Sequence, residues 1–267
     1  MSAPRCAIII PSYNTGSILR ETIESVLACT RDVPVLVVID GSTDGSAESL
    51  RPLQEKAGAE RLEILELPEN RGKGAAVLEG LRRALRDGFT HVLTMDADGQ
   101  HPPDWISRFV EISADFPEAA VFGCPIFDES APAARVNGRK ISNFWANLET
   151  LHWGIGDSLF GMRLYPGDAL LKAFESTRFA RRFDFDPEVA VRLAWLGVPI
   201  IRIPTPVRYL TPEDGGVSHF HYLRDNTLLT WMHARLVVGF LLRLPRLALR
   251  GRNPLRNMPS RVDPSRD

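Results

Sequence analysis

The chain has 267 residues, of which 44% are hydrophobic and 24% charged, and its formal net charge is −1. This composition is typical of a soluble globular protein with enough apolar residues for one large core or two small ones. Three cysteines, Cys6, Cys29 and Cys124, lie far apart without disulfide or metal spacing, which indicates a reducing compartment. The start of the chain lacks the pattern of a secretion signal, so we expect a cytoplasmic protein.

Short apolar runs rich in β-branched residues recur along the chain and predict strands buried on both faces. They cover residues 6–10, 33–39, 62–67, 89–95, 119–124 and 200–203. Between these runs, apolar residues at helical spacing predict helices. The helices follow the turn at 14–15, cover 46–57, follow the loop at 69–74, cover 103–115 and 141–153, and continue from 186 to 196. Residues 128–140, rich in Ala, Pro, Arg and Gly, predict a loop or lid.

Capping residues predict where two of these helices begin. Asn14 or Thr15 is expected to cap the first helix, because short polar side chains accept hydrogen bonds from free backbone amides. Asp186 is expected to cap the last, with Pro187 in its first turn.

Strands that alternate with helices predict right-handed crossovers and a mostly parallel sheet flanked by helices. Ligands of such sheets bind beyond the carboxyl ends of the strands. The polar turns after Ile10, Ile39 and Met95 should therefore meet at one rim, together with the loop at Asn70.

The turn after Met95 has the composition of a metal site. Asp96, Asp98 and Gln100 place two carboxylates and an amide at alternate positions. Mg²⁺ and similar ions take such oxygens, with water and substrate phosphates completing the shell. The pattern predicts a divalent cation that binds a diphosphate, although a plain turn has the same composition.

Four segments in this order resemble family 2 glycosyltransferases of the GT-A fold, above all the dolichyl-phosphate mannose synthase and polyprenyl-phosphate glycosyltransferase branch. They are Pro11-Ser12-Tyr13-Asn14, Asp40-Gly41-Ser42-Thr43-Asp44-Gly45, Asn70-Arg71-Gly72-Lys73-Gly74 and Asp96-Ala97-Asp98-Gly99-Gln100-His101-Pro102-Pro103. The resemblance covers about residues 6–220 and implies a GT-A catalytic domain at 1–222.

The resemblance assigns a role to each segment on the donor side. Pro11, Tyr13, Asn14 and Asp40 would form the nucleoside pocket, Lys73 would approach the phosphates, and Asp96-Ala97-Asp98 with Gln100 would hold Mg²⁺ or Mn²⁺. Many relatives have a second acid where this chain has Ile39, so the base of the donor stays open.

Further residues match the acceptor side of the resemblance. Arg163 would bind an acceptor phosphate, or it would form a salt bridge with Asp157. If the acceptor is a hydroxyl, a carboxylate must take its proton, with Asp157 ahead of Asp186 and Glu188. The last match, the segment with Arg208 and Ser218, belongs to the donor side of the resemblance, where these two residues would help to bind the donor. His219 in the same segment stands in place of a lysine and would bind metal or phosphate.

Residues 226–262 carry seven arginines and no acid. Their apolar run at 236–242 is shorter than a membrane-spanning helix needs. The sequence predicts that 223–267 forms a basic amphipathic tail, either on an anionic membrane surface or against a protein, with Pro245 breaking or kinking the helix.

The sequence therefore predicts a metal-dependent, inverting glycosyltransferase. It would move a sugar from a nucleotide-diphosphate donor to a polyprenyl phosphate or lipid-like hydroxyl, at the inner face of the cytoplasmic membrane. No nucleic-acid partner is expected. Two alternatives remain: a sugar-nucleotide nucleotidyltransferase, and a non-catalytic nucleotide-binding protein.

Overall fold

The computed structural model describes residues 3–127, 133–208 and 222–255. Its centre is one seven-stranded sheet of order β3-β2-β1-β4-β6-β5-β7. The strands are β1 (Cys6–Ser12), β2 (Val35–Asp40), β3 (Leu62–Leu67), β4 (His91–Thr94), β5 (Ala120–Ile126), β6 (Arg163–Pro166) and β7 (Ile200–Pro206). Only β6 is antiparallel to its neighbours β4 and β5, so the predicted mostly parallel sheet is confirmed.

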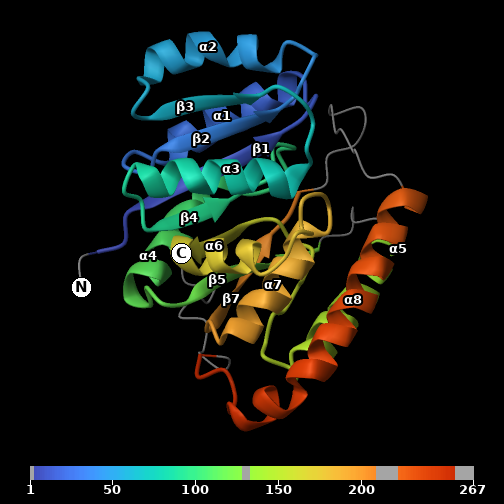
Figure 1. Cartoon of the computed structure of the whole chain (residues 1–267). Helices are drawn as coiled ribbons and strands as arrows, with labels where there is room; N and C mark the ends of the chain where they lie inside the picture. Colours follow the sequence, from blue (N-terminus) through green and yellow to red (C-terminus); the bar gives the residue numbers. More distant parts are fainter. Residues whose placement is uncertain (1–2, 128–132, 209–221, 256–267) are drawn as a thin grey trace.

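Helices cover both faces of the sheet (Figure 1). They are α1 (Ser17–Cys29), α2 (Ser46–Ala57), α3 (Lys73–Arg86), a short 3-10 turn (Pro103–Trp105), α4 (Ile106–Asp115), α5 (Ala133–Glu149), α6 (Gly167–Glu175), α7 (Phe185–Leu196) and α8 (Tyr222–Leu249).

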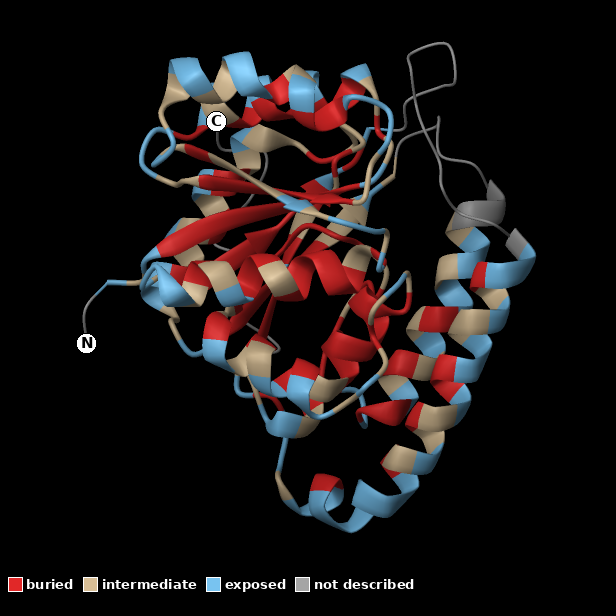
Figure 2. Cartoon of the chain, turned by 45° about the horizontal axis from the view of Figure 1, so that its top comes forward, coloured by how far each residue is buried: buried red, intermediate tan, exposed pale blue. Residues whose placement is uncertain are grey.

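The alternation of side chains along the strands divides the core in two. Ile8 and Ile10 of β1 pack with α1, α2 and α4 on one face, whereas Ile9 packs with α3, α6 and α7 on the other. Both faces of the sheet are buried, as expected for strands whose sequences are continuous apolar runs. Figure 2 shows this buried centre beneath exposed outer helix faces.

Three predicted boundaries were wrong. The region predicted as a loop at 128–140 already contains the first half of α5, which begins at Ala133 and ends at Glu149 rather than near 153. The N-cap of the first helix is Gly16, and not Asn14 or Thr15. The side-chain oxygen of Asn14 instead accepts a hydrogen bond from the backbone amide of Thr43. The helix predicted from Asp186 begins at Phe185, with Asp184 as its N-cap.

Helix α8 includes Pro245 and continues to Leu249, so the proline does not break the helix. It packs along α5 and against α7 (Figure 1). The segment Leu223–Leu249 is long and apolar enough to cross a membrane, although this is weak evidence by itself. One face of α8 is buried in the protein, through Met232, Leu236 and Phe240.

Candidate active site

The carboxyl ends of β1, β2 and β4 meet at one rim, as predicted. Parallel pairing sets Ser12 beside Ile39 and Ile9 beside Thr94, so the turns that follow the three strands are neighbours. The site is built on these turns and on the N-terminal end of α3.

Lys73, the first residue of α3, joins two of the predicted acids. Its Nζ lies 2.6 Å from Asp96 Oδ1 and 2.6 Å from Asp186 Oδ2. Burial opposes the charge on Lys73, but the two carboxylates outweigh burial and raise its pKa. Burial likewise opposes ionisation of Asp96, and Lys73 and His101 outweigh it, so the pKa of Asp96 is lowered. Lys73 and Asp96 are therefore both charged at neutral pH.

Gly161 is packed against this ion pair. A β-carbon at this position would clash with the Asp96 carboxylate and would lie 2.9 Å from Lys73 Nζ. The Gly161 carbonyl also accepts a hydrogen bond of 2.9 Å from the Thr94 hydroxyl. Absence of a side chain is thus what lets the 157–163 segment close over Asp96.

Asp98 has no ion-pair partner within the described residues, and its carboxylate accepts a hydrogen bond from the Gln100 backbone amide at 3.1 Å. Burial and the adjacent charge of Asp96 raise the pKa of Asp98. No group of three His, Cys, Asp or Glu side chains converges among the described residues. Two half-buried carboxylates and an amide still fit a hard cation that takes its other ligands from phosphate and water.

His101 is a site residue that the sequence reasoning quoted without a role. Its Nε2 lies 3.2 Å from Asp96 Oδ2, and its ring packs edge-on against Phe160, with 4.7 Å between ring centroids. The sequence signal for His101 was its position five residues after Asp96. Phe160, which departs from the family motif, thus has a definite contact: it holds the imidazole that orients Asp96.

The predicted nucleoside pocket is a pair of cross-linked loops. The backbone amide of Asn14 donates to Ser42 Oγ at 3.0 Å, and the side-chain oxygen of Asn14 accepts from the backbone amide of Thr43 at 2.8 Å. Asp40 is buried and accepts the backbone amides of Arg71 and Gly72 at 2.9 and 2.7 Å. Asp40 therefore fixes the loop that leads into Lys73.

Pro11 and Tyr13 flank the same turn. Pro11 is buried at the end of β1, and Tyr13 is 36% exposed, so only the tyrosine ring presents a broad surface at the rim. An exposed aromatic ring of this kind can pack against a base or a ribose.

Arg163 lies inside the protein, and its predicted role as the acceptor-phosphate ligand stays a prediction. Its guanidinium is fully buried, stacks 4.4 Å from the Phe122 ring centroid, and donates to the backbone carbonyls of Asp186 at 2.6 Å and Asp157 at 3.0 Å. Its partner is thus the carbonyl of Asp157 and not the carboxylate. Arg163 holds together the two chain segments that carry candidate acids.

Both oxygens of the Asp157 carboxylate already accept hydrogen bonds within the protein. Oδ1 accepts from Arg139 at 2.7 Å and from the Leu159 amide at 2.9 Å, and Oδ2 accepts from Asn143 at 3.2 Å. Arg139 lies in the first half of α5, where a loop was predicted, and its side chain is 19% exposed. Sequence reasoning therefore missed the arginine that pairs with Asp157.

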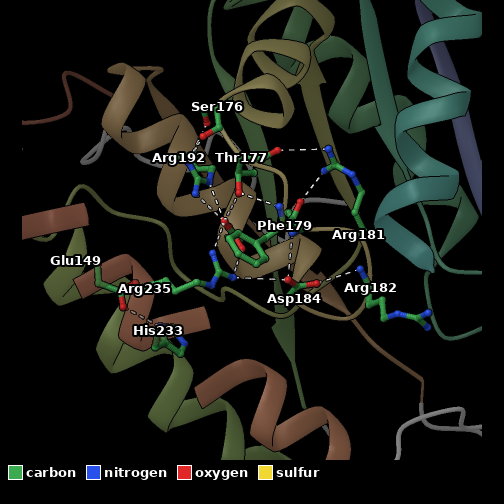
Figure 3. A network of polar contacts seen from close by, with 12 residues as sticks. Glu149, Ser176, Thr177, Phe179, Arg181, Arg182, Asp184, Arg192, His233 and Arg235 are labelled. Atoms are coloured by element: carbon green, nitrogen blue, oxygen red, sulfur yellow. Dashed lines mark hydrogen bonds and ion pairs between the residues drawn. The ribbon is translucent and has the colours of Figure 1, made fainter. Parts of the chain in front are cut away.

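Glu188 belongs to a buried network of ion pairs, and its predicted role as a general base stays a prediction. Its carboxylate is fully buried and accepts from Arg192 at 2.7 Å and Arg235 at 2.9 Å, with Thr177 at 3.0 Å. Figure 3 shows Arg192, Arg235 and Thr177 converging there, beside Asp184. Burial opposes its charge, but the hydrogen bond from Arg235 and the charges of both arginines lower the pKa of Glu188.

Glu188→Gln is expected to lower stability and leave catalysis intact. Leaving two partly buried arginines without their anion costs about 3 kcal/mol, or about 8 °C in Tm for a chain of this size. Since the folded pKa is depressed, this stabilisation is present above the unfolded pKa near 4.3 and is lost as pH falls through the folded value. Thermal melts at pH 7 and pH 4 measure it. A loss of kcat above 100-fold at unchanged Tm would restore Glu188 as a catalytic acid.

Arg208 follows β7 and reaches the metal-site turn through its backbone, since its amide donates to the Gln100 carbonyl at 3.1 Å. Its side chain is exposed. Ser218 and His219 lie outside the described residues, so their predicted roles remain predictions.

A family model described as Glycosyl transferase family 2 matches residues 7–173, more than half of the chain. The chain belongs to glycosyl transferase family 2. This confirms that the protein is a glycosyltransferase, and the match contains strands β2 to β6 and all but the first residue of β1, together with Lys73, Asp96, Asp98 and Arg163.

Two similar proteins have names that refer to polyprenyl substrates. A polyprenol monophosphomannose synthase of Mycolicibacterium smegmatis is 29% identical over 80% of this chain and 80% of its own length. An undecaprenyl-phosphate mannosyltransferase of Micrococcus luteus is 28% identical over 75% of this chain and 82% of its own. The resemblance to the polyprenyl-phosphate branch is thereby confirmed.

Solved structures confirm the fold. A mannosyltransferase of Pyrobaculum calidifontis, in complex with GDP-Man and Mn²⁺, has a TM-score of 0.59 at 22% identity, over 95% of this chain and 67% of that one. Glucosyl-3-phosphoglycerate synthase of Mycobacterium tuberculosis, in complex with Mn²⁺ and UDP, has a TM-score of 0.60 at 18% identity, over 90% of this chain and 80% of that one. At these identities the likeness supports the GT-A fold alone.

Proposed function

We propose that this family 2 enzyme is a metal-dependent, inverting glycosyltransferase that moves a sugar from a nucleotide-diphosphate donor to a polyprenyl phosphate. The observation that carries the proposal is the position of Asp96 and Asp98 at the strand rim, with Lys73 held between Asp96 and Asp186. A single displacement at the anomeric carbon inverts its configuration and needs little beyond positioning and stabilisation of the leaving diphosphate.

Asp96, Asp98 and the Gln100 amide would hold Mg²⁺ or Mn²⁺. Such an ion acts as a Lewis acid on the leaving diphosphate oxygen. Lys73 is the cation that the chain itself supplies beside that position, and Asp40 fixes the loop that carries it. The structural relatives bind Mn²⁺ together with GDP-Man or UDP, which supports a divalent ion without choosing between the two metals.

The state of the three candidate acids favours a phosphate acceptor over a hydroxyl. The carboxylates of Asp157 and Glu188 are filled by arginines, and Asp186 is paired with Lys73. A phosphate acceptor is already an anion and needs no strong base, whereas a hydroxyl does. Oδ1 of Asp186 has no hydrogen-bond partner in the described part of the chain, but it is buried, which also disfavours its use by a hydroxyl acceptor. Arg139 is the half-buried cation available to an acceptor phosphate.

The outer faces of α5 and α8 fit a membrane surface. Ile141, Phe144 and Leu148 of α5 are exposed at helical spacing, opposite the buried Ser142 and Glu149. On α8 the corresponding exposed residues are Trp231, Val238, Leu241 and Leu242. The two helices run side by side over the same flank of the protein (Figure 1).

The charges of this flank complement an anionic bilayer. The acids of the two helices, Glu149 and Asp225, are both buried, whereas Arg243 and Arg246 are exposed. An apolar stripe flanked by arginines suits helices that lie in the interface of anionic lipids. We therefore place the enzyme at the inner face of the cytoplasmic membrane, with no nucleic-acid partner.

Leu242→Asp is expected to weaken binding to phosphatidylglycerol vesicles at least about tenfold, because a leucine that is 79% exposed would otherwise enter the interface. Vesicle flotation measures the bound fraction. Ser25→Asp adds the same charge to the exposed face of α1, on the opposite side of the sheet, and should float like the wild type. Equal flotation of the three proteins would remove the membrane assignment.

Donor binding tests the proposed enzyme class. Thermal melts with a panel of nucleotide sugars and Mn²⁺ should show stabilisation by one donor, since a ligand that binds only the folded state raises Tm. A protein that is stabilised by no nucleotide sugar, with or without Mn²⁺, would contradict the proposal.

A further inference from the structure

Helix α8 is fastened to the catalytic domain by buried polar contacts as well as by apolar packing. His233 Nδ1 lies 2.9 Å from Glu149 Oε1 of α5, and Arg235 pairs with Glu188 of α7 (Figure 3). Glu149 is fully buried and His233 is 7% exposed. The contact with Glu149 is the start of a longer chain of hydrogen bonds.

This chain leads from α8 through α5 to the acceptor side of the site. His233 Nε2 lies 3.0 Å from Ser142 Oγ, and Ser142 Oγ lies 3.1 Å from Ser158 Oγ. Ser158 then donates to Asn143 Oδ1 at 2.7 Å, and Asn143 Nδ2 donates to Asp157 Oδ2 at 3.2 Å. Both serines are buried, so water does not replace these bonds.

Counting hydrogens fixes the direction of the chain. An amide oxygen only accepts, so the Ser158 hydroxyl gives its single hydrogen to Asn143. Ser142 must then donate to Ser158, and His233 Nε2 must donate to Ser142. One more proton lies between His233 Nδ1 and the carboxylate of Glu149. The pair Glu149–His233 thus holds two protons and no net charge, and every bond points the same way.

The chain ends at an ion pair. Asp157 accepts from Arg139 at 2.7 Å, and the backbone amide of Ser158 donates to the same Asn143 oxygen at 2.7 Å, which ties the backbone beside Asp157 to α5. We propose that His233 of α8 positions the Asp157–Arg139 ion pair through this buried chain.

The inference rests on the proposed function, because it gives Arg139 an acceptor phosphate to bind and gives α8 a membrane to lie on. Because each hydroxyl of the chain has a single hydrogen and gives it to the next member, a displacement of α8 disturbs each bond down to Asp157, the partner of Arg139. Docking of α8 on lipid would in this way be coupled to the geometry of the cation that faces the lipid phosphate.

Two substitutions remove the hydrogen bond between His233 and Ser142, each from one of its two partners. Ser142→Ala removes the hydroxyl, and His233→Asn keeps an N–H near the position of Nδ1 but removes Nε2. Each should weaken binding of farnesyl phosphate, a short soluble probe for a polyprenyl phosphate, at least about threefold. The double variant should lose no more affinity for farnesyl phosphate than either single variant, because both substitutions remove the same hydrogen bond.

A second readout needs no ligand. The rate at which phenylglyoxal modifies Arg139, followed by peptide mass spectrometry, should rise at least about threefold in both variants as the ion pair loosens. Mn²⁺ affinity, measured by electron paramagnetic resonance, should stay unchanged, because Asp96 and Asp98 lie outside the chain. Thr150→Val is the matched control: it removes a buried hydroxyl just after α5, which donates to the backbone carbonyls of Ala146 and Asn147 and not to the chain, and it should leave all three values unchanged.

An unchanged Arg139 rate in the folded variants would overturn the inference, as would a parallel loss of farnesyl phosphate and Mn²⁺ binding with a lower Tm. Absence of farnesyl phosphate binding to the wild type would instead count against the proposed acceptor, while the Arg139 rates still decide whether the chain positions the ion pair.

Discussion

Asp98→Asn is expected to reduce kcat at least about 1000-fold without lowering Tm. The substitution removes a carboxylate ligand of the proposed metal and with it the stabilisation of the leaving diphosphate. The fold should tolerate it, because Asp98 has no ion-pair partner among the described residues and the neighbouring charge of Asp96 already raises its pKa. Relief of that repulsion leaves Tm equal to or slightly above the wild-type value.

The comparison with Asp96→Asn separates metal binding from folding. Asp96 is paired with Lys73 at 2.6 Å and contacts His101, so its neutral replacement should lose both activity and stability. Binding of Mn²⁺ by electron paramagnetic resonance should fall in both variants. An Asp98→Asn enzyme with near wild-type kcat and Mn²⁺ affinity would refute the metal assignment.

Gly161→Ala is expected to reduce kcat at least about 100-fold. A single β-carbon would clash with the Asp96 carboxylate and crowd Lys73 Nζ, and a displacement of about 1 Å at the reacting centre costs this much. The backbone of Gly161 does not have a positive φ, so the effect comes from the contact and not from strain. Steady-state kinetics with saturating Mn²⁺ measure it.

Gly138→Ala is the matched control for this substitution. Gly138 lies within α5, where nothing stands within 4 Å of an added β-carbon, so alanine should raise stability by about 0.5–1 kcal/mol. Wild-type kcat in both variants would show that Gly161 is not packed against the catalytic ion pair.

The sequence predicted the parts of the fold that rest on local patterns. Continuous apolar runs such as 6–10 and 62–67 became strands, and the polar turns after β1, β2 and β4 met at one rim, because parallel pairing aligns carboxyl ends. Lys73 and Asp96 could be placed there from the motif that each carries.

Contacts between distant segments were beyond the sequence. Arg163 is the first residue of the four-residue strand β6, and it is buried because the carbonyls of Asp157 and Asp186 accept its hydrogens. Glu188 resembled a catalytic acid until α8 supplied Arg235 from 47 residues away. Residues 133–140 contain a glycine and three cations, a composition that favours a loop, and they nevertheless form the first half of α5, the helix that packs along α8.

The central claim is tested most directly by transfer itself. The enzyme would be incubated with Mn²⁺, the radiolabelled nucleotide sugar that stabilises it, and undecaprenyl phosphate in phosphatidylglycerol vesicles. The account predicts a labelled product that extracts with the lipid, releases its sugar in mild acid, and has the anomeric configuration opposite to that of the donor. Release of a nucleoside monophosphate or pyrophosphate, or tight donor binding with no lipid-linked sugar, would contradict it.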